Sequence, residues 1–149
     1  MDEVDAMTKK LRLVWLALLV SIVLYVTVAE MVKPENVGSV FDSRIVHGAL
    51  IALAVLLVGV AVVLRQRKVR PFEEEVRSGR VSTEGALSPE QTSQVGRWQG
   101  GHLASWIMCE AVALFGFVLR FLGGTRLEAA PFYAVAVLLM VVWMPKKPG

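Results

Sequence analysis

Charged residues are unevenly spread along the chain and leave four long apolar stretches. Residues 45–64 contain no charge over 20 positions, 13–29 none over 17, and 129–144 none over 16. Residues 98–119 form a 22-residue stretch in which Glu110 is the only charge. Because a bilayer core about 30 Å thick is crossed by about 20 apolar residues in a helix, each stretch predicts a transmembrane helix.

We therefore predict an all-α fold in which residues 1–149 form a single four-helix membrane domain. The predicted helices cover approximately 11–32, 45–65, 98–122 and 130–144. The composition agrees, with 55% hydrophobic residues and a mean hydropathy of +0.57. The fourth helix is short, so it would cross with little tilt or with help from its flanks.

The first apolar stretch has one alternative interpretation, as a cleaved signal peptide. Lys9, Lys10 and Arg12 provide the positive flank of such a signal. However, residues 27–29 match a small-x-small cleavage site only partly, and the apolar run exceeds the usual ~7–15 residues. We therefore expect a retained first span.

Basic residues concentrate at one set of helix ends and predict the orientation. The segment 65–97 carries seven arginines and lysines, and bases also precede the first helix and follow the fourth. Lysine and arginine near span ends mark the cytoplasmic side of a membrane. Both termini and the basic loop 65–97 are therefore expected on the cytoplasmic side of a bacterial-type inner membrane. Trp15, Trp98 and Trp143 lie near the same ends, where an interfacial position is expected.

The same topology explains the net charge of +3, so we predict the lipid bilayer as a partner and no nucleic acid. The polybasic start of the loop has two interpretations: an inside anchor only, or a site for anionic lipid headgroups. The residues concerned are Arg65, Arg67, Lys68 and Arg70.

The loop itself is expected to contain helical turns. Residues 70–79 read as a short surface helix ended by Gly79. "SPEQ" (88–91) matches a capping box, with Ser88 as the cap and Gln91 reaching back to it. The third long helix is therefore expected to begin outside the membrane.

Two charges near the outer ends of the first and third helices are candidates for an ion pair. Arg120 lies ten residues beyond Glu110, about 15 Å along the helix axis, where arginine can extend toward water. Glu30 should lie at a similar depth. We predict a structural Glu30–Arg120 pair, with Arg44 as a second candidate partner for Glu30 and two independent interfacial charges as the alternative.

Glu110 is the residue that most needs an explanation. Its helical neighbours are apolar, including Trp106, Leu114 and Phe117, and an apolar surround favours the neutral carboxylic acid. Acidic residues inside membranes are rare and mark functional candidates. Glu110 is thus either a hydrogen-bonding link to a hydroxyl or carbonyl of a neighbouring helix, or a proton- or ion-binding group.

The two histidines raise the possibility of a tetrapyrrole ligand. His47 and His102 begin antiparallel helices, so they should lie on opposite sides of the membrane and cannot clamp one haem together. A single histidine with a ligand from a partner is the remaining form of this hypothesis. The only cysteine is Cys109, which excludes an internal disulfide. We predict no cofactor, no metal site and no catalytic residues.

The second and third helices resemble the proton-carrying hairpin of the proteolipid (subunit c) of rotary ATPases. The matching segments are "HGALIALAVLLVGVAVV" and "CEAVALFGFV". The resemblance implies that Glu110 occupies the ion-carrying position of a mid-membrane acid. The chain differs from the family in its 33-residue loop, in its fewer glycines and in Arg120.

Together these patterns predict a small, non-enzymatic accessory or structural subunit that packs against other membrane subunits or against itself. Gly48, Ala52 and Gly59 give the second helix a face of small residues that another helix could approach. The alternatives are a proteolipid-like proton or cation carrier using Glu110, and a subunit that binds a tetrapyrrole through one histidine.

Overall fold

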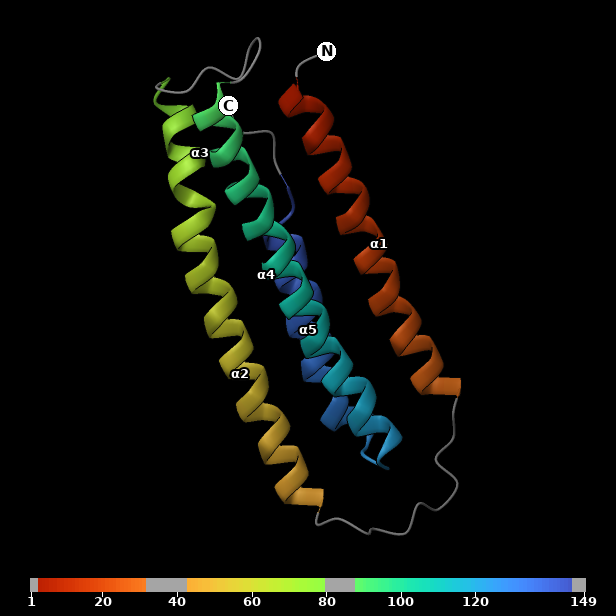
Figure 1. Ribbon diagram of the computed structural model, residues 1–149. Helices are drawn as coiled ribbons and strands as arrows, with labels where there is room; N and C mark the ends of the chain where they lie inside the picture. Colours follow the sequence, from red (N-terminus) through yellow and green to blue (C-terminus); the bar gives the residue numbers. More distant parts are fainter. Residues whose placement is uncertain (1–2, 32–42, 80–87, 146–149) are drawn as a thin grey trace.

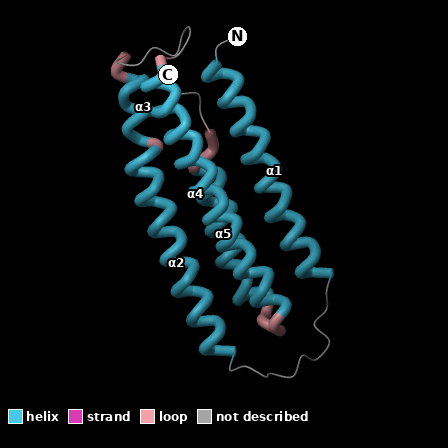
Figure 2. Tube along the Cα trace, in the orientation of Figure 1, coloured by secondary structure: helices cyan, strands magenta, loops and turns pink. Residues whose placement is uncertain are grey.

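The computed structural model describes residues 3–31, 43–79 and 88–145, and in these ranges the only regular structure is helical (Figure 2). The helices are α1 (Glu3–Met31), α2 (Ser43–Lys68), α3 (Arg70–Arg77), α4 (Pro89–Phe121) and α5 (Arg126–Val142). The all-α prediction is confirmed. α1, α2 and α4 belong to segments long and apolar enough to cross a membrane. α5 has 17 residues, so the structure supports three spans and leaves the fourth a prediction.

The helix boundaries differ from the predicted ones mainly at the predicted loop. α2 continues through Lys68, α3 follows almost directly, and α4 begins at Pro89 instead of 98. Ser88 and Gln91 form the predicted capping box, since each side chain bonds to the backbone N–H of the other. The short surface helix is also confirmed, and Gly79 ends it with a φ of +70°, which glycine adopts readily.

α4 is the central helix of the bundle. α1 and α2 lie on separate flanks of α4, and α5 packs along it from behind in the view of Figure 1. The start of α1, the end of α5 and the whole of α3 lie at the same end of the bundle. We call it the α3 end. The opposite end, where α4 turns into α5, we call the Arg126 end. The common placement of both terminal helix ends is the one that the predicted topology requires.

A tight turn joins α4 to α5. The N–H of Gly124 bonds to the carbonyl of Leu119, and that of Gly123 to Arg120, which is the hydrogen-bond pattern of a Schellman ending. Gly123 has a φ of +91°. Thr125 then caps α5 and pairs with Glu128 in a second capping box.

The end of α5 is held by donors from other helices. Trp15 Nε1 donates to the carbonyl of Met140 at 2.8 Å, and Trp106 Nε1 to that of Trp143 at 3.1 Å. These bonds satisfy carbonyls that a helix end leaves without partners. Of the three tryptophans predicted near the membrane interface, Trp98 and Trp143 are buried within the bundle, together with Trp106, and their interfacial depth stays a prediction. Their rings form the core of the α3 end.

Large apolar side chains cover the outside of the bundle. Leu13 is 72% exposed and Val55 67% exposed, and α1, α2 and α5 each carry several others. A monomeric water-soluble protein rarely exposes apolar surface on this scale. The outward faces of the long helices therefore suit contact with lipid or with other apolar helices.

Gly101 allows α4 to pass close to the end of α2. A Cβ atom at this position would lie 2.9 Å from Val69 Cγ2 and 3.0 Å from Lys68 Cβ. Glycine to alanine usually stabilises a helix by about 0.5–1 kcal/mol. We expect Gly101→Ala to lower the free energy of unfolding instead, by about 1–3 kcal/mol, because buried Val69 must move. Denaturant unfolding followed by circular dichroism measures the change.

The neighbouring Gly100 provides the control for this prediction. A Cβ atom at Gly100 would meet nothing within 4 Å, so Gly100→Ala should be neutral or stabilising. Equal effects of the two substitutions would contradict the close approach of α2 and α4 at Gly101.

Candidate functional site

Glu110 lies where α1 packs against α4. Its Oε1 accepts a hydrogen bond from Ser21 Oγ at 2.6 Å and another from Tyr25 Oη at 2.9 Å. Ser21 and Tyr25 are four residues apart on α1, so they share one face of that helix. Of the two partner types expected for Glu110, the structure places hydroxyls beside it. The hydroxyls are the donors, and Glu110 Oε1 accepts from both of them.

The two hydroxyl partners were not predicted from the sequence. They are 89 and 85 residues from Glu110 along the chain, and no local pattern connects them. The available signal was their spacing, because two hydroxyls on one face of an apolar helix predict a polar partner across an interface. Tyr25 is further held by its ring contact with Phe117, at 5.9 Å between centroids.

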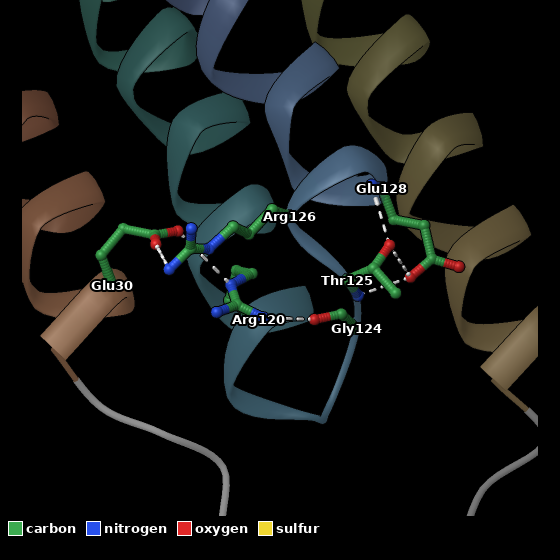
Figure 3. Close-up of polar contacts among 6 residues, drawn as sticks. All are labelled: Glu30, Arg120, Gly124, Thr125, Arg126 and Glu128. Carbon is green, nitrogen blue, oxygen red and sulfur yellow. Dashed lines mark hydrogen bonds and ion pairs between the residues drawn. The ribbon is translucent and has the colours of Figure 1, made fainter.

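At the Arg126 end, Glu30 interacts with two arginines (Figure 3). The predicted partner Arg120 places Nε 3.9 Å from Glu30 Oε1, while Arg126 Nη2 lies only 2.6 Å from Oε2. Arg120 Nη1 also donates to the carbonyl of Gly124 at 2.7 Å. Arg120 thus closes the α4–α5 turn and contacts Glu30 only at long range. Arg126, which the sequence analysis did not propose, makes the short ion pair.

On the other side of this turn, the Glu128 carboxylate contacts both Thr125, which caps α5, and His47 of α2. Its Oε2 accepts hydrogen bonds from the backbone N–H and the hydroxyl of Thr125, at 2.7 and 2.9 Å. These bonds, the backbone one first, hold the pKa of Glu128 below its usual value. Its Oε1 faces His47 of α2 with 4.0 Å to Nδ1, and the His47 ring meets the edge of Phe132.

The α3 end contains a buried polar group that we call the His102 cluster, formed by Arg65, Glu73 and His102. His102 is fully buried. Its Nδ1 lies 3.3 Å from Arg65 Nη1 and its Nε2 3.7 Å from Glu73 Oε1. A guanidinium can only donate, so Nδ1 is the acceptor and Nε2 carries the proton of the neutral ring. That N–H points toward Glu73 beyond hydrogen-bond distance, so this contact is electrostatic.

Aromatic rings enclose the His102 cluster on several sides. The His102 ring packs between Trp98 at 5.0 Å and Trp106 at 5.2 Å, centroid to centroid. Phe72 of α3 packs on Trp98 at 5.7 Å, and the Arg65 guanidinium lies 5.5 Å from the centre of the Trp143 ring. The cluster therefore joins α2, α3, α4 and the end of α5 at one point.

The predicted headgroup residues divide into two groups. Arg65 turns into the bundle, as just described, although the sequence analysis grouped it with the surface bases. Arg67 and Lys68 stay exposed and line a shallow cleft of about 140 Å³ with Arg97 of α4. Arg70 is exposed at the start of α3. A lipid-headgroup role of the exposed bases stays a prediction.

The two histidines lie at opposite ends of the bundle, as expected, because His47 begins α2 and His102 contacts its last turns. Both ring nitrogens of His102 face side chains of this chain, which leaves His47 as the histidine open to a ligand. Among residues 3–31, 43–79 and 88–145, no group of three or more metal-ligating side chains is found.

Fold and sites together define an all-helical chain with three helices suited to a membrane and polar links between them. In comparisons with protein families, with curated proteins and with solved structures, the chain matches none of them.

Proposed function

We propose that the chain is an integral membrane protein of a bacterial-type inner membrane and a non-enzymatic accessory or structural subunit of a membrane complex. The exposed apolar side chains on three long helices support the membrane location. The collection of bases around α3, at the end where α1 begins and α5 ends, supports cytoplasmic termini.

The observation that carries the structural role is the use made of Glu110. Its carboxyl group lies in an apolar stretch and accepts hydrogen bonds from two hydroxyls of α1. It therefore links α4 to α1 within the same chain. Because both hydrogen-bond partners of Glu110 come from α1 of the same chain, this arrangement favours a link between helices over an ion-carrying acid.

A second observation supports assembly with other helices. Gly48 and Gly59 of α2 have nothing within 4 Å of where a Cβ atom would stand, and Ala52 between them is exposed. Small residues on an open helix face let another backbone approach closely. α2 is therefore the proposed contact for a partner subunit or a second copy.

The test is Glu110→Gln, which keeps an oxygen acceptor for Ser21 and Tyr25 but cannot release a proton. We expect the same partners to copurify in mild detergent, in amounts within about twofold of the unaltered protein. Glu90→Gln, at the exposed first turn of α4, is the matched control.

The carrier hypothesis predicts different results from the same variants. Glu110→Gln would abolish proton or cation transport in vesicles, Glu110→Asp would retain part of it, and a carbodiimide would label Glu110 at neutral pH. That set of results would replace the structural role with the carrier.

A further inference from the structure

A cavity of about 370 Å³ lies between α2 and α5. Its walls are mostly apolar, with Ile51, Val55 and Val58 from α2 and Phe132 and Val135 from α5. Val112 of α4 belongs to its lining as well. The volume lies at the lower end of the range for small-molecule sites, about 300–1,000 Å³.

The cavity is elongated along the bundle and has one polar end. His47 and Val58 of α2 both line the cavity. They are eleven residues apart, which corresponds to about 16 Å by helical rise. The polar end is formed by His47 and Glu128, at the edge of the apolar stretch that begins at Ile45. A ligand here would place its polar group at the Arg126 end and its apolar part along the helices.

The polar end offers the Glu128 carboxylate, which accepts hydrogen bonds, and the His47 ring, which can donate or accept them. Glu128 Oε2 is occupied by Thr125, whereas Oε1 faces His47 at 4.0 Å, too far for a direct hydrogen bond. The Glu128 side chain is 44% exposed and the His47 side chain 26% exposed. A hydroxyl placed between them can donate to Oε1 and accept from a ring N–H.

Charge and shape restrict the ligand class. The Glu128 carboxylate repels a fatty-acid carboxylate or a phosphate at this end. Phe132 lines the cavity and its ring lies 6.3 Å from the His47 ring at 62°, so an aromatic group stands at this end for contact with a flat ring. A neutral ring with hydroxyls and a long apolar tail fits both features.

We propose that this cavity binds a prenylated quinol, with a ring hydroxyl between His47 and Glu128 and the ring beside Phe132. The proposal concerns binding alone and goes beyond the structural role. It does not depend on Glu110, so the two can fail separately.

The experiment uses the full chain in phosphatidylcholine nanodiscs with decylubiquinol as the probe, measured by equilibrium dialysis. Val55→Trp narrows the cavity from an exposed position, and Leu56→Trp, 62% exposed on the same helix, is its matched control. We expect Val55→Trp and His47→Phe each to weaken binding about tenfold or more, and Leu56→Trp to change it less than about twofold.

Several results would overturn the proposal. One is the absence of saturable binding to the unaltered protein, and another is equal binding by Val55→Trp and Leu56→Trp. Displacement of the probe by phosphatidylethanolamine would indicate a lipid site instead. A Soret absorption band that is lost in His47→Phe would indicate a tetrapyrrole ligand. Circular dichroism and gel filtration check the fold of each variant. If Val55→Trp does not fold, Ile51→Trp, also exposed and lining the cavity, replaces it.

Discussion

Replacing His102 by alanine is expected to lower the free energy of unfolding by about 2–4 kcal/mol. The substitution removes a fully buried ring from between Trp98 and Trp106 and leaves a cavity. It also removes the acceptor of Arg65, so a partly buried guanidinium loses its hydrogen bond. Steric trapping or denaturant titration in bicelles measures the loss.

Two further variants separate the contributions within the His102 cluster. Glu73→Gln keeps the packing but removes the charge that faces His102, so a smaller loss, about 1 kcal/mol, is expected. His47→Ala at the other end removes a partly exposed histidine and should cost less than His102→Ala. If His102→Ala costs no more than His47→Ala, the cluster does not hold the α3 end together.

Removing the carboxyl of Glu110 is expected to loosen α1 from the rest of the bundle. Glu110→Leu leaves the hydroxyls of Ser21 and Tyr25 without their acceptor, and we expect a loss of about 1–3 kcal/mol. Tyr25→Phe should cost less in the unaltered protein and almost nothing beside Glu110→Leu. Interhelical hydrogen bonds in membranes contribute about 0.6 kcal/mol on average and up to about 1.7, so the double-mutant cycle should give a coupling of that size.

Thr27 supplies the control for the cycle. Its hydroxyl donates to the carbonyl of Val23 in its own helix at 2.8 Å, whereas the hydroxyls that reach Glu110 are those of Ser21 and Tyr25. Thr27→Val and Glu110→Leu should therefore add within about 0.5 kcal/mol. Coupling of Thr27 as strong as that of Tyr25 would contradict a specific hydroxyl–carboxyl link.

The sequence predicted what depends on local pattern. Apolar length located the long helices, and turn chemistry located α3 and the Ser88 cap, because these features depend on neighbouring residues. The start of α4 at Pro89 was anticipated only as an extension outside the apolar stretch. The length of the uncharged stretch did not predict this start, because Arg97 interrupts the apolar pattern but not the helix.

The direction of individual side chains was not predictable in the same way. Arg65 stands among surface bases in the sequence, yet the rotation of α2 turns it toward His102 while Arg67 stays outside. Glu30 was paired by depth with Arg120, but Arg126, placed in the next helix by the tight α4–α5 turn, reaches it more closely. These pairings depend on helix rotation and turn geometry, which hydropathy does not encode.

The central place of α4 has a consequence for the order of synthesis. α1 and α2 are made first, but each packs mainly on α4, which follows later in the chain. At about 5–20 residues per second, both helices exist for several seconds before α4 is complete. During that interval Ser21, Tyr25 and Arg65 lack the partners seen in the finished bundle. A ribosome-bound chain that ends after α3 therefore presents two apolar helices that lack their main packing partner until α4 emerges.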